Sequence, residues 1–491
     1  MLLCAGTLIH LGLVIIQASA RIPRWDFSHY YVAAIAMRDG FNPYATDLRP
    51  LGRLIGLDGI ARATDTPFFL LCFEPLTWLR PVAAYWAWFG INAVSLIVAM
   101  LLSLRAAPPL NWRQVISLCA IILLYPPVSN HIYFAQTQIV VLLLVVVTMG
   151  AFQARSDRTA GIALAAAVLL KVFPWAIAGY FVILRRWRVC GWMIAGLAAG
   201  ATATIAAFGV ASNASFVAGT QLARSAEFLA RPANVALGSF VSRLFWYAAG
   251  AVTMSPWLDW MRALTVGAVE LALIGLTIFA TLPRAGATLE DSREDSVEIG
   301  GRRKAVAKIP SKTEVAGGNR YHAVGSFEPG IDREAGGFAL WVTAAIMLSP
   351  TAWIHYLVLL ILPFMLIAAA GWHGSASPRA LWLMAASYAT ISLSMALAGG
   401  GQSWLAEHQH VKTALEECAT LSLLLAYASV WFFVIDSPRG SGAQSQQLIE
   451  SLGNPIKEAS AIVMARARTS GAPVDSIGNQ MKPAPTIVSR G

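Results

Sequence analysis

Long apolar runs recur along the chain and constrain its fold more than any other feature. A helix needs about 20 apolar residues to cross a bilayer, and fewer where it stops at a cavity. The clear candidates are 1–19, 82–104, 115–128, 138–153, 189–209, 262–283, 338–350, 354–370, 380–398 and 415–435. The run 160–184 holds Lys171 and Pro174, and proline breaks a helix, so we predict two short helices, 160–172 and 174–184. The pattern predicts an all-α polytopic membrane protein with about twelve transmembrane helices, within a range of about 10–13.

Composition agrees with a membrane protein and argues against several other classes. Of the 491 residues, 57% are hydrophobic and 13% are charged, which is about half the charged fraction of a soluble globular chain. The net charge of +10 is scattered over short connections and chain ends, as is typical of membrane orientation and contact with anionic lipid. Nucleic-acid binding needs clustered positive charge, so we expect no nucleic-acid partner. The five cysteines show neither metal-site nor disulfide-framework spacing.

Basic residues in the short loops predict the orientation of the helices. Those predicted to lie inside are Arg105, Arg113, Arg155, Arg158, Arg185, Arg186, Arg188 and Arg379. This places both termini in the cytoplasm and the polar regions 20–81 and 210–261 outside. The inner region 284–336 reads as a flexible loop and the tail 437–491 as disordered, which leaves 1–436 as the transmembrane domain.

The first apolar run ends in a sequence that resembles a signal-peptidase site, Ala18-Ser19-Ala20. No basic residue precedes the run, and further spans follow it. We therefore expect an uncleaved first helix, with cleavage as the alternative.

The outer loop 20–81 contains a carboxylate, Asp26, close to the end of the first helix. Partial desolvation at the membrane boundary raises a carboxyl pKa and suits a general base. Apolar and aromatic residues follow at helical spacing, and Gly40 and Pro43 close the segment, which predicts an amphipathic interfacial helix. The residues alone leave two readings of Asp26 open, a helix cap and a catalytic base.

Two further groups of residues fall on the same predicted face. Lys171 stands at the end of an apolar run, where it either snorkels to the interface or pairs with an anionic head group such as a lipid phosphate. The run LSPTAWIHY (348–356) places His355 beyond Pro350, and broken helices with polar residues at membrane depth commonly line a site. A base, a cation and a histidine fit group transfer from a lipid-linked phosphate, but equally a transporter gated by a buried carboxylate.

Five short sequence blocks carry a more specific signal. They are Asp26-Phe27, Tyr30-Tyr31, Ala33-Ala34, Gly40 and Asn42-Pro43-Tyr44; Pro67 and Pro75-Leu76; Gln136, Gly161, Lys171 and Pro174; Asn234, Leu237, Gly238 and Arg243; and Ser349-Pro350, Trp353 and His355. In order and spacing, these blocks resemble glycosyltransferase family 87, the polyprenol-phosphate-dependent mannosyltransferases of the C-type superfamily. The similarity extends over nearly all of residues 1–436.

The resemblance implies a C-type glycosyltransferase fold in the bacterial inner membrane, with the active site facing outward. It implies inverting transfer of a hexose, with mannose expected, from a polyprenyl phosphate to a lipid or glycan hydroxyl, without a metal or other cofactor. Asp26 would deprotonate the acceptor, Lys171 and His355 would steady the departing phosphate, and Gln136 would hold the sugar. Tyr30, Tyr31, Asn234 and Trp353 complete the expected substrate site.

The chain also departs from the family pattern. Ala135 stands for the usual Gly, Gln138 for Asn, and Val235-Ala236 for Gln-Ser. The last change affects the expected contacts to the acceptor and leaves the identity of the acceptor open. The alternatives to an enzyme are a flippase or transporter for a lipid-linked sugar, and a non-catalytic member of the family.

Overall fold

The computed structural model describes residues 2–19, 26–57, 61–222, 229–231, 234–248, 255–282, 329–400 and 409–436. Every regular element in these ranges is a helix, and an isolated antiparallel bridge joins Asn234 to Trp353. The all-α prediction is therefore confirmed for the described part of the chain. The predicted tail 437–491 and most of the predicted inner loop 284–336 lie outside these residues.

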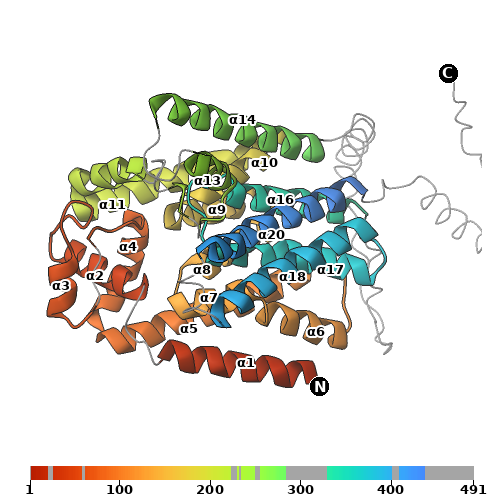
Figure 1. The fold of residues 1–491 in the computed structure, drawn as a ribbon, viewed down its shortest axis with the longest axis horizontal. Coiled ribbons are helices and arrows are strands. Elements are labelled where there is room, and N and C mark those ends of the chain that lie inside the picture. The colour runs from red at the N-terminus through yellow and green to blue at the C-terminus, as the bar shows by residue number, and fades with distance from the viewer. Residues whose placement is uncertain are drawn as a thin grey trace, which may run out of the picture. The chain divides into compact units, whose positions relative to one another are not determined.

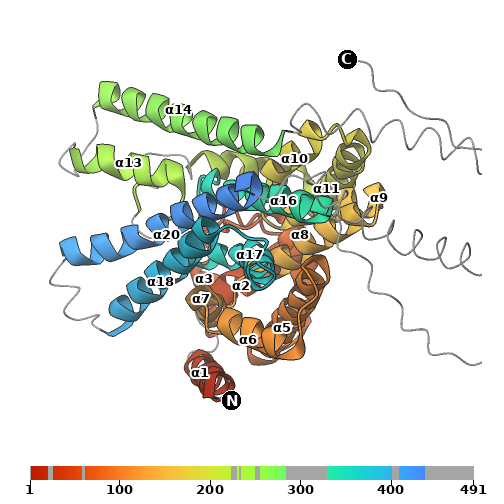
Figure 2. The same ribbon diagram turned by 90° about the vertical axis from the view of Figure 1, so that its right-hand side faces the viewer.

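The α-helices of the described residues are labelled in chain order in Figure 1. The first half contains α1 (Leu2–Ser19), α2 (Asp26–Arg38), α3 (Arg49–Leu54), α4 (Pro67–Phe73), η1 (Glu74–Trp78), α5 (Pro81–Ala106), α6 (Trp112–Leu123), α7 (Pro126–Phe134), α8 (Gln138–Gln153), α9 (Asp157–Leu170), η2 (Phe173–Ile177), α10 (Ala178–Ile183) and α11 (Trp187–Leu222). The second half contains α13 (Leu237–Ala248), α14 (Pro256–Thr281), α16 (Pro329–Met347), η3 (Ile354–Leu360), α17 (Ile361–Trp372), α18 (Pro378–Gly400) and α20 (Gln409–Asp436). Figure 2 shows α18 and α20 packed side by side, and α13 beside α14.

Several of these helices are long and apolar enough to cross a membrane. Among the described residues there are six such helices, or seven if the bent pair α6 and α7 forms one span. Together they make the chain a multi-pass membrane protein. Twelve crossings and the C-type fold stay predictions.

Prolines mark where the apolar runs are divided. The run predicted as one helix over 115–128 is two helices, because Pro126 and Pro127 cannot continue the hydrogen-bonded ladder of α6. α7 starts at Pro126 and is bent by 54° from α6. The start predicted at 338 was also too late, since α16 already begins at Pro329. The last residues assigned to the inner loop therefore belong to a helix.

Small residues let α9 and α11 approach closely. A Cβ on Gly161 would lie 2.5 Å from the Val189 carbonyl oxygen and 2.6 Å from Cβ of Trp192. On the facing helix, Gly196 and Gly200 meet Ala165 and Leu169 of α9 in the same way. In a bilayer, where helix association depends on close packing, such contacts fix neighbouring helices. Here they fix the end of α9, which precedes Lys171.

The helix predicted directly after Asp26 exists as α2, but it is not amphipathic. Residues Phe27 to Met37 are buried, apart from the half-buried His29. The helix is enclosed because α3, α4 and η1 of the same loop pack against it. Its aromatic rings meet those of α4, with Tyr30 and Phe69 centroids 4.8 Å apart. The loop thus encloses α2 in a small core of its own, so the predicted solvent-exposed face is absent from the residues described there.

Candidate active site

Asp26 is the first residue of α2, and its side chain is 31% exposed. One carboxylate oxygen accepts a hydrogen bond from the Gln136 side-chain amide, and the other lies 3.6 Å from His29 Nδ1. A carboxylate in the first helical turn is also favourably placed against the helix dipole. The two sequence readings of Asp26, cap and base, both stay predictions.

Gln136 reaches Asp26 from the turn between α7 and α8. Its side chain is buried, and its amide oxygen accepts a hydrogen bond of 2.7 Å from the Tyr30 hydroxyl. Tyr30, Gln136 and Asp26 thus form one hydrogen-bonded chain across two segments that lie about a hundred residues apart. Because the amide donates to Asp26, it favours the ionised carboxylate and fixes its orientation.

The turn that carries Gln136 depends on a left-handed residue. Ala135 has φ +52° and ψ +47° and ends α7, and its carbonyl accepts a hydrogen bond from the Trp88 indole. Glycine adopts this conformation without the steric cost that a Cβ imposes. This explains physically why the resemblance predicts glycine at this position.

Replacing Ala135 by glycine is expected to stabilise the protein by about 1 kcal/mol, because it removes that steric cost. The measurement is the midpoint of thermal unfolding of the purified protein in detergent. Ala99→Gly, in the interior of α5, is the matched control and should lower the stability by a similar amount. A lower unfolding midpoint for Ala135→Gly would show that the turn is not strained.

Burial changes the acidity of Asp26. Loss of hydration raises the pKa of its carboxyl to about 6, and the negative charge of Asp65 adds to the rise. The positive charge of Lys171 and the hydrogen bond from Gln136 oppose it. A carboxylate with a pKa near 6 is ionised at neutral pH and is a stronger proton acceptor than an exposed aspartate.

Lys171 lies at the end of α9 and has a protein partner. Its ammonium donates a hydrogen bond of 2.7 Å to Asp65, in an ion pair whose side chains are 16% and 5% exposed. Of the two sequence readings, snorkelling does not describe this arrangement, while a phosphate contact stays a prediction. Asp65 is not among the site residues that the sequence predicts. A lysine near an apolar core requires an anion, but this loop holds several acidic residues and nothing in the sequence distinguishes Asp65.

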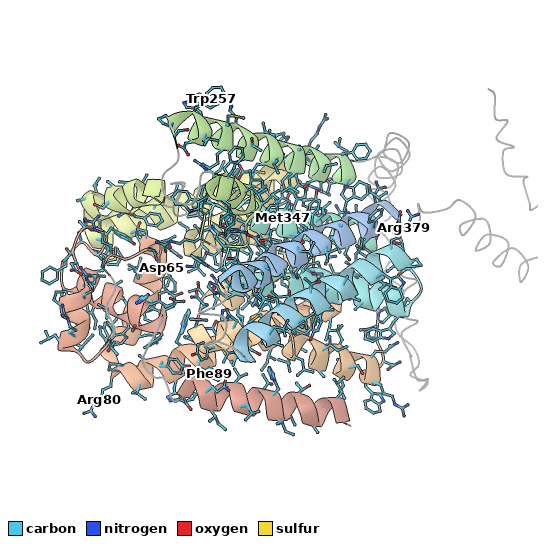
Figure 3. All side chains as sticks on the ribbon, viewed as in Figure 1. Asp65, Arg80, Phe89, Trp257, Met347 and Arg379 are labelled. Carbon is cyan, nitrogen blue, oxygen red and sulfur yellow. The ribbon has the colours of Figure 1, made fainter. Side chains whose placement is uncertain are left out.

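The chain around Asp65 is fixed from both sides. Thr66 caps α4 by accepting a hydrogen bond from Phe69 N, and its hydroxyl donates to the Leu169 carbonyl at 2.5 Å. The Tyr44 hydroxyl donates to the Asp65 carbonyl at 2.7 Å. Figure 3 labels Asp65 next to α4. The first-loop segment is thereby attached to the last turn of α9, which brings Asp65 and Lys171 together.

His355 approaches this cluster from η3. Its side chain is buried, and it lies within electrostatic range of Lys171 and His131. The next residue, Tyr356, packs on Phe173 with ring centroids 5.0 Å apart. The structure thus gathers Asp26, Tyr30, Gln136, Lys171 and His355, and it adds Asp65 to them.

The remaining predicted site residues make other contacts. The Tyr31 hydroxyl donates to the Leu79 carbonyl at 2.6 Å. The fully buried Asn234 side chain donates to the Pro350 carbonyl and accepts from Ala352 N at 2.8 Å. Together with the bridge to Trp353, these bonds attach the segment before α13 to the segment before η3. Asn234 thus holds the backbone next to His355, and substrate contacts of Tyr31, Asn234 and Trp353 stay predictions.

Within the described ranges, no three His, Cys, Asp or Glu side chains are placed to hold a metal ion. The expectation of cofactor-free chemistry stays a prediction.

Comparison with known proteins gives a family match for the middle of the chain. The model of glycosyltransferase family 87 matches residues 64–291. The matched range includes Asp65, Gln136, Lys171 and Asn234, whereas Asp26 precedes it and His355 follows it. No curated protein matches the chain. The match to glycosyltransferase family 87 covers just under half of the chain, and together with the apolar helices it shows that the protein is a multi-pass membrane glycosyltransferase.

Proposed function

We propose that this glycosyltransferase is inverting and moves a hexose, with mannose expected, from a polyprenyl-phosphate donor to a hydroxyl of a lipid or glycan acceptor. The observation that carries the proposal is the placement of a partly desolvated carboxylate, Asp26, in one cluster with a buried ammonium, Lys171. Transfer from a lipid phosphate requires both a proton acceptor and a positive charge for the leaving group.

The proposed reaction is a single displacement. The acceptor O–H proton passes to Asp26 while the acceptor oxygen forms a bond to the anomeric carbon. The bond between that carbon and the phosphate oxygen breaks, and its electron pair leaves with the polyprenyl phosphate. Lys171 and His355 stabilise the negative charge that grows on this phosphate. Gln136 holds the Asp26 carboxylate and is the proposed contact to the sugar.

Of the two carboxylates in the cluster, Asp26 is the better base. Its side chain is 31% exposed, so an acceptor hydroxyl can approach it, whereas that of Asp65 is 5% exposed and bonded to Lys171. A transporter for a lipid-linked sugar, the alternative left by the sequence, gains no support, because the family is one of glycosyltransferases.

The proposed location is the bacterial plasma membrane, with the site facing the outside and products that enter the cell envelope. The outward orientation rests on the arginines of the predicted inner loops and on the donor class. Polyprenyl-phosphate sugars serve reactions on the outer side of the membrane, which nucleotide sugars do not reach. Membrane lipid would then surround both the donor chain and the protein.

The donor class can be tested with the purified full-length protein in liposomes. Radiolabelled polyprenyl-phosphate mannose, polyprenyl-phosphate glucose and a nucleotide-linked mannose are each incubated with an envelope lipid extract, with and without EDTA. We expect label to enter an acceptor only from a polyprenyl phosphate, most strongly with mannose, and to be unchanged by EDTA. Transfer from the nucleotide sugar alone would refute the proposed donor.

A further inference from the structure

The pair of Asp65 and Lys171 is assembled from two rigid backbone segments. Lys171 ends α9, and its N–H is bonded to the Ala167 carbonyl at 3.0 Å. The adjacent Thr66 donates to the carbonyls of the same helix end, and Tyr44 holds the Asp65 carbonyl. The pair is therefore in place before any substrate binds.

A lysine at this position could make either of two ion pairs. Its four-carbon stem is flexible, and both Asp26 and Asp65 act on its charge. In the structure the ion pair of Lys171 is made with Asp65, while the Asp26 carboxylate contacts Gln136 and His29. A direct ion pair between Lys171 and Asp26 would weaken Asp26 as a base. An opposite charge at contact distance stabilises the ionised carboxylate and so lowers its affinity for a proton.

The ammonium keeps capacity for a further anion. A lysine has three N–H donors, and within the described part of the chain the hydrogen bond of Lys171 goes to Asp65. Two donors are left for phosphate oxygens, and the Lys171 side chain is 16% exposed. A buried ion pair contributes little to stability after the cost of desolvation, so stability alone is a weak reason for this one.

We propose that Asp65 is a positioning residue of the active site, which holds the Lys171 ammonium away from Asp26 and presents it to the donor phosphate. This inference rests on the proposed function, since it takes Asp26 as the base and a lipid phosphate as the leaving group. With Asp65 as its partner, the Lys171 ammonium can stabilise the leaving phosphate without weakening Asp26 as the base.

The charged groups that act on Asp26 can be named, and they make the proposal testable by pH. They are Asp65 before α4 and Lys171 at the end of α9, and the His29 imidazole of the same helix lies 3.6 Å from the carboxylate. The other elements packed against α2 bring Arg49, Arg53 and Glu74, of which Arg49 pairs with Asp47 at the surface. Removal of Asp65 should lower the pKa of Asp26, and removal of Lys171 should raise it.

The experiment measures kcat/KM for polyprenyl-phosphate mannose against pH in liposomes that contain the full chain. For the unaltered protein the acidic limb should have its midpoint near pH 6, where Asp26 loses its proton. Asp65→Asn should move this midpoint down by about one pH unit and lower kcat/KM at neutral pH by about tenfold or more. For Lys171→Met, the acidic limb of the remaining activity should have its midpoint at a higher pH than in the unaltered protein.

Two further variants separate positioning from a loss of folding. Asp65→Glu keeps the charge and should restore the midpoint, while Asp47→Asn makes the same change as Asp65→Asn in an exposed ion pair and should leave the profile unaltered. If Asp65→Asn does not fold, the double variant Asp65→Asn with Lys171→Met removes the unpaired cation. Its midpoint should then lie below that of Lys171→Met alone.

A wild-type midpoint for Asp65→Asn, or shifts of Asp65→Asn and Lys171→Met in the same direction, would overturn the positioning role. Failure of the unaltered protein to use any polyprenyl-phosphate sugar would instead refute the proposed function. The two failures are therefore distinguishable in one set of measurements.

Discussion

Asparagine in place of Asp26 is expected to lower kcat by roughly 10²–10⁴-fold, the usual contribution of a general base. The amide oxygen of asparagine can still accept the hydrogen bond from Gln136, so the geometry of the site is kept while the proton acceptor is lost. Donor binding should change little, because the proposed contacts to the phosphate come from Lys171 and His355. Initial rates of transfer and equilibrium binding of polyprenyl-phosphate mannose, both in liposomes, measure the two effects.

Stability provides the control for this prediction. The pKa of Asp26 is raised to about 6 in the folded protein, so the ionised carboxylate is disfavoured there. The contribution of this carboxyl to folding stability is fully present below the ordinary pKa of an aspartate. It is lost as the pH rises through about 6. The asparagine variant escapes this loss and should unfold at an equal or higher temperature than the unaltered protein at pH 8. Wild-type transfer rates in Asp26→Asn would remove Asp26 from the chemistry.

Periodicity and proline predicted the backbone of the membrane domain well. The apolar run 138–153 is α8 with the same bounds, and the division at Lys171 and Pro174 separates α9 from η2 as expected. Both results follow from local causes, because continuous apolar residues favour one helix and proline ends it. Gln136 beside Asp26 agrees with the expectation of one site built from separate blocks.

Contacts across long sequence distances could not be predicted in the same way. Asp65 and Lys171 are separated by 106 positions, and the choice of Asp65 among the acids of its loop depends on how Thr66 is attached to α9. The character of α2 was misjudged for a related reason. Its residues fit one apolar face, but α3, α4 and η1 cover the other faces as well, and their packing is a tertiary property.

A second buried ion pair supports the segment that contains Asn234. Arg243 is 1% exposed, and its guanidinium bonds both carboxylate oxygens of Glu417, which is 25% exposed, at 2.5 and 2.7 Å. The same guanidinium donates to the carbonyls of Arg231 and Asn234, at 3.2 and 2.6 Å. It thereby links α20 to the segment that bridges to Trp353, two residues before His355.

Replacing Glu417 by alanine is therefore expected to destabilise the protein by about 3 kcal/mol, because it leaves a buried guanidinium without its anion. The midpoint of thermal unfolding in detergent measures the effect, and Asp47→Asn, which breaks an exposed pair, should leave it unchanged. If the cost comes from the unpaired charge, Arg243→Leu combined with Glu417→Leu should recover part of the lost stability, although the carbonyls of Arg231 and Asn234 still lose a donor. An unchanged midpoint for Glu417→Ala would mean that the guanidinium finds another anion or water.

Because the segment held by Arg243 leads to His355, the double variant should fold yet transfer sugar more slowly than the unaltered protein. This result would separate support of the fold from support of the site.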